Sequence, residues 1–526
     1  MPAPSDTNDP LAAYQQARAP LPDTYQRWHL YGAGLENVGR DGEPESVPLE
    51  RPAADQILVR HDACGICYSD IKIITLGANH PRLVGRDLAR DPVVMGHEVA
   101  LTIIEAGTNH RNTFEPGQRF IVQADIYYGG MNLAYGYALR GGMSQYGLIG
   151  PEVLEGDDGC YLLPLKDSTG YAEAALVEPW ACVEAAYHWT EQREPARADR
   201  RATFAAGRFT GVPLDTEARI GGDEKVDAIS FDSAPSSEVF EAACAHLATS
   251  GVAFLNSPPE GLVRIDVGRV HYDGHLYVGP KPNGRSEIKG GGTAWFIGAA
   301  GPMGQMHVQR ALSLPHPPAR LITTDRNPQR IAALREHCGP LARARGVELI
   351  QYNVKEDGPP DFARIAPQGF DDIVVLVPDV SAIEDAFPRL AEGGVLNIFA
   401  GLARGTMAIL EIGLVATRNV RIVGTSGSSI HDMTTTRDLL ESGRLQTGAS
   451  LAAIGGMEAF RDGLAGVRDG RFPGKTVIFP NIANLPLTAL TDLAPIRPNV
   501  YAKLLDGTIW TKAAEDELLR EGLRAS

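Results

Sequence analysis

The feature that most constrains the fold is a run in the second half of the chain, TAWFIGAAGPMGQMHVQRAL (residues 293–312). An apolar strand-like stretch, a glycine-rich turn and a helix-like stretch follow one another directly in it. The later apolar stretches RLITTD, DDIVVLVP, GVLNIFAG and VRIVGT are separated by helical ones. Alternating strands and helices predict a parallel, doubly wound sheet, which makes this an α/β domain over residues 289–425.

The first part of the chain has a different pattern. Between about residues 25 and 165, short β-type runs such as QILVRHDA, VALTIIEAG and RFIVQADIYY are broken by clusters of Gly, Pro and Asp. This pattern predicts a β-rich domain. A charged stretch, TEQREPARADRR (190–201), is typical of a linker or a surface excursion.

The region after this linker repeats part of the α/β domain. The order of segments in residues 226–256 and 268–279 matches that in residues 370–400 and 414–424, with Gly251 answering Gly394 and Gly279 answering Gly424. We interpret residues 200–288, called the inserted copy below, as a partial duplicate, although any two β-α-β units share some likeness. Its segment ATFAAGRFTG (202–211) is at best a degenerate phosphate turn. We therefore expect the inserted copy to serve packing or oligomer contact and to bind no dinucleotide.

Composition narrows the possible partners and compartment. The formal net charge of −16 argues against nucleic acid or an anionic membrane surface, because both require a basic face. The N-terminus resembles no signal peptide, and no stretch approaches the 18 or so apolar residues that span a bilayer, so a cytoplasmic protein is expected. Six cysteines in 526 residues cannot form a disulfide framework, which indicates a reducing compartment or metal chemistry.

Three short motifs in the β-rich part carry potential metal ligands: CGICYSD (64–70), GHE (96–98) and VEPWACV (177–183). A catalytic zinc takes about three ligands from thiolate, imidazole and carboxylate and keeps one position open. Cys67, His97 and Glu98 or Glu178 supply that set. Cys64 and Cys67 form a CxxC pair, which could be half a zinc ribbon or a redox couple. No second CxxC exists, which excludes the ribbon, and the adjoining Ser-Asp favours a catalytic metal with Cys67 as ligand and Cys64 as a packing residue.

The glycine-rich turn predicts a dinucleotide site. Glycines between a strand and a helix let the backbone approach a pyrophosphate, whose charge the helix N-terminus stabilises. An acidic residue, Asp325, ends the next strand, where it can accept hydrogen bonds from the ribose and favour NAD over NADP. The neighbouring Arg326 weakens that preference. The expected cofactor-binding residues are Gly298, Gly301, Pro302, Met303, Gly304, Asp325 and Arg326.

The order of these motifs resembles the zinc-containing medium-chain dehydrogenase/reductase family, in its sorbitol dehydrogenase-like branch. The resemblance covers nearly the whole chain apart from the inserted copy and parts of both tails. Within the branch, the chain is most similar to the L-sorbose-1-phosphate reductase type in the segments GQRFIVQAD, EPWACV, AAGPMG, GFDDIVVLVP, NIFAG and GTSGSSIHDM.

The resemblance implies the domain plan. A GroES-like catalytic domain would begin in residues 1–178, and residues 179–199 would form a helix and linker. The inserted partial Rossmann-like duplicate (200–288), the Rossmann NAD-binding domain (289–425) and a return to the catalytic domain with a C-terminal extension (426–526) would follow.

The resemblance also implies the site. Cys67 and His97 would bind zinc, with Glu98 and Glu178 sharing the remaining positions directly or through water. Asp70 would orient His97, and Ser69 would pass the substrate proton away. Two departures from the family matter: DIYYGGMNLAYGYALRGG (125–142) has no cysteine, so one zinc per chain is expected, and Lys72 stands where a relay histidine is common.

The expected function is hydride transfer between a nicotinamide cofactor and the secondary alcohol or ketone of a polyol, sugar or sugar phosphate. NAD is the expected cofactor, with NADP as the alternative. Family members suggest a homodimer or homotetramer. Two alternatives remain: a zinc enzyme with retained NAD that catalyses isomerisation or elimination through transient oxidation, and a noncatalytic nucleotide-binding protein. The intact ligand set argues against the second.

Overall fold

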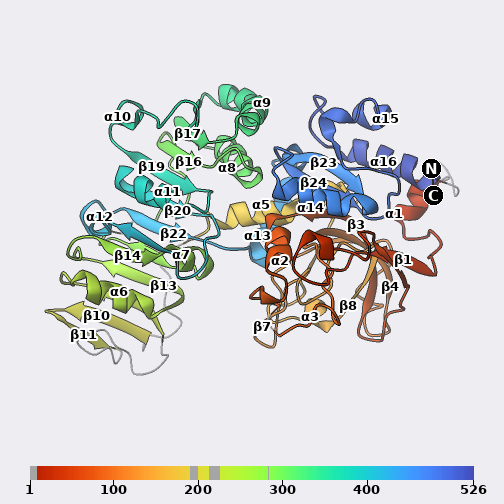
Figure 1. The fold of residues 1–526 in the computed structure, drawn as a ribbon, viewed down its shortest axis with the longest axis horizontal. Coiled ribbons are helices and arrows are strands. Elements are labelled where there is room, and N and C mark those ends of the chain that lie inside the picture. Colours follow the sequence, from red (N-terminus) through yellow and green to blue (C-terminus); the bar gives the residue numbers. More distant parts are fainter. Residues whose placement is uncertain (1–8, 84, 190–199, 212–224, 282–283, 526) are drawn as a thin grey trace. The chain divides into compact units, whose positions relative to one another are not determined.

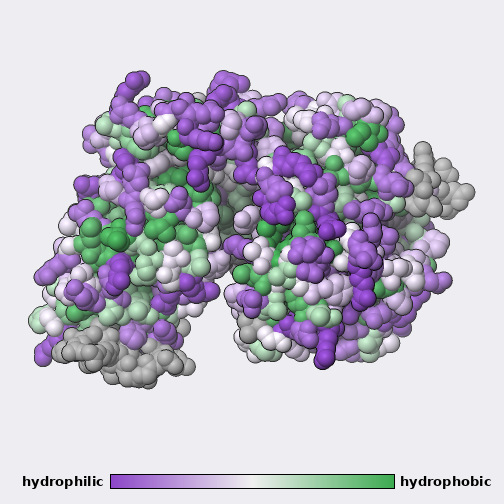
Figure 2. Space-filling model, in the orientation of Figure 1, coloured by the Kyte–Doolittle hydropathy of each residue, from purple (hydrophilic) through white to green (hydrophobic). Residues whose placement is uncertain are grey.

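The computed structural model describes residues 9–83, 85–189, 200–211, 225–281 and 284–525. The chain divides into two compact units, Met1–Cys182 with Ser428–Ser526, and Val183–Gly427 (Figure 1). On the visible face of each unit, hydrophilic residues are interspersed with smaller hydrophobic areas (Figure 2). Among the described residues, no helix has the length and apolarity needed to cross a membrane.

The first unit is built on an eight-stranded sheet whose strands come from an early part of the chain, residues 57–164, and a late part, residues 451–489. Its strand order is β25-β23-β24-β3-β4-β5-β9, with β8 also pairing β3. The bounds are β3 (Ile57–Ile66), β4 (Glu98–Ala106), β5 (Arg119–Val122), β8 (Tyr146–Ile149), β9 (Leu162–Pro164), β23 (Leu451–Gly456), β24 (Lys475–Phe479) and β25 (Thr488–Ala489). The return of the chain after residue 428 therefore completes the β-rich domain, because β24 pairs directly with β3.

Short helices and strands surround this sheet. The helices are α1 (Pro10–Gln15), α2 (Tyr68–Leu76), α3 (Pro151–Leu154), α4 (Tyr171–Ala175), α13 (Ile430–Glu441), α14 (Phe460–Arg468), α15 (Pro498–Tyr501) and α16 (Lys512–Ala525). Helix α5 (Val177–Ala185) carries the boundary between the units. Two small antiparallel pairs are β1 (Thr24–Arg27) with β2 (Glu45–Pro48), and β6 (Tyr127–Tyr128) with β7 (Met131–Asn132).

The second unit contains one eleven-stranded sheet in the order β11-β10-β12-β13-β15-β22-β20-β19-β16-β17-β18. Its nucleotide-binding part has the parallel strands β16 (Thr293–Ile297), β17 (Arg320–Asp325), β18 (Glu348–Asn353), β19 (Phe370–Val375), β20 (Leu390–Ile398) and β22 (Arg421–Gly424). The connecting elements are α8 (Pro302–Ser313), α9 (Pro328–Ala344), α10 (Phe362–Ile365), α11 (Val380–Ala386), β21 (Met407–Leu410) and α12 (Gly413–Thr417). The predicted parallel, doubly wound sheet is confirmed.

The inserted copy continues the same sheet beyond β22. It contributes β10 (Arg201–Ala205), β11 (Arg208–Gly211), β12 (Val226–Phe231), α6 (Ser237–Ala245), β13 (Leu247–Leu255), β14 (Val263–Asp266), α7 (Val267–Tyr272) and β15 (Leu276–Val278). Strand β15 pairs with β22 in the antiparallel direction. The parallel strands β10, β12, β13 and β15 therefore run opposite to the parallel strands of the nucleotide-binding part. In Figure 1 the yellow-green strands of the inserted copy lie beyond the light-blue β22, on the side away from the teal β19 and the green β16.

Residues 202–211, which at best resembled a degenerate phosphate turn in the sequence, do not form one. Strands β10 and β11 form an antiparallel hairpin, and its turn residues Ala206 and Gly207 have φ angles of 51° and 77°. Positive φ at both central residues is typical of the tight turns that fit the twist of a hairpin. The segment is thus a strand–turn–strand unit without the helix that a pyrophosphate site needs.

Candidate metal and nucleotide sites

Cys67 lies where a buried strand becomes a helix. Every residue of β3 is buried, and Cys67 follows its last residue as the N-cap of α2. The Asp70 carboxylate accepts the backbone N–H of Cys67 at 2.9 Å and so fixes the start of the helix. Ser69 Oγ lies 3.3 Å from Cys67 Sγ. The motif CGICYSD therefore presents a partly exposed thiol with a hydroxyl beside it.

His97 and Glu98 lie near Cys67, at the start of the neighbouring strand β4. Strand β4 begins at Glu98 and runs antiparallel to β3, with Glu98 opposite Gly65. A Cβ at Gly65 would lie only 2.0 Å from Glu98 Oε2, so glycine is required for this close approach. Gly96, with a φ of 95°, turns the chain into His97. The end of one strand thus meets the start of the other, which brings together motifs 30 residues apart.

Cys67, His97 and Glu98 form a compact group. One potential ligand atom from each lies within 4.8 Å of the others. Among the described residues, the buried Glu98 Oε2 has no hydrogen-bond partner. A thiol, an imidazole and a carboxylate in this arrangement match the donors that zinc prefers, and the partnerless oxygen is available to a cation.

Asp70 is placed to orient His97. Its Oδ1 lies 3.6 Å from His97 Nδ1, and both side chains are buried. Burial alone would lower the pKa of His97, but the Asp70 carboxylate raises it well above its usual value. A carboxylate behind a ligating imidazole fixes the orientation of the ring and increases its basicity.

Lys475 is part of this site and was not identified from the sequence. It is the first residue of β24, and its buried Nζ is hydrogen-bonded to Glu98 Oε1. Burial opposes the charge of Lys475, yet Glu98 raises the pKa of this lysine above its usual value. A lone lysine that opens the apolar run TVIF was the only available signal, and nothing in the sequence connects it to Glu98.

Glu178 lies near the group of three but is not one of its members. It occupies the first turn of α5, and Cys182 Sγ donates to its Oε1 at 3.7 Å. Burial raises the pKa of Glu178 to about 7, an effect that Glu98 increases while the charges of His97 and Lys475 oppose it. The carboxyl group is thus sensitive to the charge at the candidate metal site.

Charged side chains also lie on the other side of His97, around Tyr137. The rings of His97 and Tyr137 are 5.8 Å apart between centroids, and the Arg82 guanidinium lies 5.0 Å from the Tyr137 ring. Arg82 also forms a 2.7 Å ion pair with Asp125. Burial and the charges of Arg82 and Lys72 lower the pKa of His80 to about 4. Arg82 and Lys72 are therefore the basic side chains near the candidate metal ligands, while the His80 imidazole beside them is neutral at pH 7.

The second unit carries the predicted nucleotide turn. Gly298, with a φ of 77°, follows β16, and α8 begins at Pro302. A Cβ at Gly298 would lie 2.2 Å from Val377, and one at Gly304 would lie 2.5 Å from the Ala299 carbonyl oxygen. A Cβ at Gly301 would meet no atom closer than 3.7 Å, so the space beside the helix N-terminus is open. These are the packing and access requirements of a pyrophosphate turn.

Asp325 lies beside this turn. Its Oδ2 accepts the Ala300 N–H at 3.1 Å, and its Oδ1 accepts the N–H groups of Arg326 and Asn327 at 2.7 and 3.0 Å. The carboxylate is partly exposed and Arg326 is exposed. The predicted cofactor residues from Gly298 to Gly304 and Asp325 are thus adjacent in space.

The Glu98–Lys475 pair leads to a prediction about stability. In metal-free protein, Lys475→Met leaves the Glu98 carboxylate buried without a cation, which should lower the free energy of unfolding by about 3–5 kcal/mol. The double variant Lys475→Met/Glu98→Gln should recover part of this loss, because no charge remains buried. Urea unfolding followed by circular dichroism measures both. Equal stability of the wild type and Lys475→Met would show that the pair is not formed.

Comparisons with known proteins agree with the observed fold. Residues 53–185 match the alcohol dehydrogenase GroES-like domain. The chain is 27% identical to mannitol-1-phosphate 5-dehydrogenase of Aliivibrio fischeri, over 91% of this chain and 95% of that protein. It is also 27% identical to L-sorbose 1-phosphate reductase of Klebsiella pneumoniae, over 91% and 95%.

A solved structure shares the architecture at lower identity. The structure of 2R,3R-butanediol dehydrogenase from Bacillus subtilis aligns with a TM-score of 0.56 and 15% identity, covering 87% of this chain and all of that one. At this identity the likeness shows the fold alone. The matched domain, residues 53–185, includes all four of the predicted metal-binding residues: Cys67, His97, Glu98 and Glu178.

Proposed function

We propose that the chain is an oxidoreductase of the medium-chain dehydrogenase/reductase family, in its sorbitol dehydrogenase-like branch, on the basis of its match to the alcohol dehydrogenase GroES-like domain and its likeness to two sugar-phosphate oxidoreductases over most of their length. It transfers a hydride between NAD(H) and a secondary alcohol or ketone of a polyol, sugar or sugar phosphate, with one catalytic zinc per chain. The observation that carries the proposal is the group formed by Cys67, His97 and Glu98.

The donor set suits zinc, with Cys67, His97 and Glu98 as ligands. Glu178, whose pKa responds to the charges of His97 and Glu98, would share the remaining position directly or through water. Zinc, when bound, supplies a Lewis acid for the reacting substrate oxygen. The chain's own residues hold and move the proton. Ser69 Oγ lies beside Cys67 and is partly exposed, so it would relay the proton: it takes the proton of the substrate hydroxyl while its own hydroxyl proton passes to solvent water. Asp70 keeps the His97 ring in place.

The metal assignment predicts one zinc per chain. Cys67→Ser and His97→Ala should lose zinc and abolish turnover while keeping the secondary structure, because the ligands lie on an already folded domain. Elemental analysis and circular dichroism measure both effects. Cys160→Ser, which changes an exposed cysteine, is the matched control and should keep its zinc and its activity. Two zinc ions per chain, or an active Cys67→Ser variant, would rule out this site.

The second unit supplies the cofactor residues of the proposal. The N–H groups at the start of α8 face the open space beside Gly301, where a pyrophosphate is stabilised by the helix N-terminus. Asp325 lies next to this turn with a partly exposed carboxylate. A carboxylate there accepts ribose hydroxyls and repels a 2′-phosphate, so NAD is the proposed cofactor.

The cofactor assignment is tested at Asp325. Asp325→Ser should lower kcat/KM for NAD roughly ten- to a hundredfold, because charge-assisted hydrogen bonds to the ribose are lost. Its advantage over NADP should narrow or reverse. Asp325→Asn is the matched variant, since it keeps an acceptor for the turn and removes only the charge. A wild type that prefers NADP, or a ratio that neither variant changes, would contradict the assignment.

We also propose that the substrate carries a phosphate. Two full-length relatives are named for phosphorylated substrates, mannitol 1-phosphate and L-sorbose 1-phosphate. The Arg82 guanidinium lies over the Tyr137 ring, which also contacts His97, and Lys72 lies near enough to His80 to lower its pKa. An arginine with several N–H donors recognises phosphate well, and Arg82 retains an exposed side chain beside its ion pair with Asp125.

The preference of the enzyme for a phosphorylated over an unphosphorylated substrate tests this proposal. Arg82→Gln should lower kcat/KM for L-sorbose 1-phosphate roughly ten- to a hundredfold and leave that for L-sorbose nearly unchanged. The ratio of the two values removes any general effect on the site through Asp125. Arg90→Gln, which changes an exposed arginine in the same segment, is the control and should not alter the ratio. An unchanged ratio in an active Arg82→Gln enzyme would disprove this role of Arg82 but not the dehydrogenase function.

A further inference from the structure

The two halves of the eleven-stranded sheet correspond residue by residue around their junction. Tyr277 of the inserted copy corresponds to Ile422, and Arg264 corresponds to Ile409; both pairs have the same separation along the chain (422 minus 277, and 409 minus 264). Strands β12 and β13 repeat the register of β19 and β20, including a register shift at the same place in each pair. The duplication is therefore visible in the structure as well as in the sequence.

The junction between the halves has an approximate twofold axis. Tyr277 pairs with Ile422 across β15 and β22, and Arg264 pairs with Ile409 across β14 and β21. In each case a residue lies opposite its own counterpart, which happens only on a twofold axis. The flanking pairs exchange as such an axis requires: Val263 faces Leu410, and their counterparts Ala408 and Ile265 face each other.

Close backbone approaches obey the same symmetry. A Cβ on Gly279 would lie 2.4 Å from the Val415 carbonyl oxygen, and a Cβ on its counterpart Gly424 would lie 2.6 Å from the carbonyl oxygen of Val270. The two halves thus approach each other through matching glycines, as the two faces of an isologous interface do.

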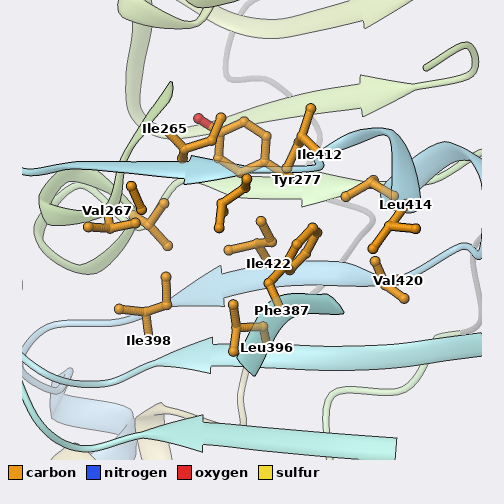
Figure 3. Close-up of a cluster of buried hydrophobic side chains, with 14 of the residues drawn as sticks. Ile265, Val267, Tyr277, Phe387, Leu396, Ile398, Ile412, Leu414, Val420 and Ile422 are labelled. Atoms are coloured by element: carbon orange, nitrogen blue, oxygen red, sulfur yellow. The ribbon is translucent and has the colours of Figure 1, made fainter. Parts of the chain in front are cut away.

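The two halves share one hydrophobic core at the junction. Ile265, Val267 and Tyr277 from the inserted copy lie in the same buried cluster as Ile412, Leu414 and Ile422 from the nucleotide-binding part (Figure 3). Polar contacts add to this packing. The Asn419 side chain accepts the backbone N–H of Lys281 at 3.2 Å and donates to its carbonyl oxygen at 2.7 Å.

We propose that the inserted copy fills, within one chain, the surface that a second copy of the nucleotide-binding fold would fill in a homodimer. The edge of β22 is a symmetric, partly apolar interface, and such an interface fits its own duplicate. The inserted copy keeps the elements that form this interface, β14, α7 and β15, and its described residues contain no phosphate turn. Any homodimer or homotetramer of the full chain must then use a different surface.

The first test removes the inserted copy. Deletion of residues 200–280 exposes the β22 edge, and the number of chains per particle should double relative to the full chain. Light scattering after size-exclusion chromatography measures this number for both proteins. In the deletion variant, the pair Ala408→Cys/Leu410→Cys should also form covalent dimers, because the axis places each of these positions opposite the other in a second chain. An unchanged number of chains in a folded deletion variant would overturn the proposal.

A second measurement uses the full chain and decides the matter if the deletion variant does not fold. Ile265→Cys/Ala408→Cys places two thiols at directly opposed, buried positions of β14 and β21. After oxidation with copper phenanthroline, the proposal expects an intramolecular disulfide: the protein remains a single-chain species on a non-reducing gel and has two fewer free thiols than the reduced double variant. The unaltered chain, with its own six cysteines, is the control. A covalent dimer of the double variant would show that the edge pairs between chains and would overturn the proposal.

Discussion

The architecture of the first unit depends on the antiparallel pairing of β3 with β4 and β24. This pairing buries the carboxylate of Glu98, and a buried carboxylate must be compensated by cations or hydrogen bonds. Lys475 of β24 compensates Oε1, while Oε2 has no hydrogen-bond partner, and the carboxylate lies beside Cys67 and His97. The same strand pairing that stabilises the domain thus creates a group of donors that suits a metal ion, and Gly65 and Gly96 make the approach possible.

The second unit uses one sheet for two purposes. Its β16–α8 turn and Asp325 form the candidate cofactor site at one half of the sheet. The inserted copy occupies the other half and repeats the strand register of the first, but its hairpin of β10 and β11 replaces the phosphate turn. The elements beside β22 follow the twofold symmetry of the junction, which is why we propose a structural role for the inserted copy.

Much of this organisation could be predicted from local patterns. The alternation of strands and helices after residue 293 and the matched segments around Gly251 and Gly394 indicated the doubly wound sheet and its partial duplicate. The motifs at Cys67 and His97 indicated the metal ligands because their order along the chain is characteristic. Lys475 and Arg82 could not be found in this way. Lys475 reaches Glu98 through strand pairing between distant segments, and the place of Arg82 depends on the Tyr137 ring. The antiparallel junction of β15 with β22 is likewise a tertiary contact without a local sequence signal.

The central claim is that Cys67, His97 and Glu98 hold a catalytic metal. Visible absorption of the cobalt-substituted protein tests it most directly, because a thiolate bound to cobalt gives a charge-transfer band. If Cys67 binds the metal, this band is present in the wild type and lost in Cys67→Ser, and the cobalt spectrum changes when a polyol or ketose substrate binds to the protein. A cobalt spectrum that is the same in wild type and Cys67→Ser, or that no substrate alters, would contradict the account.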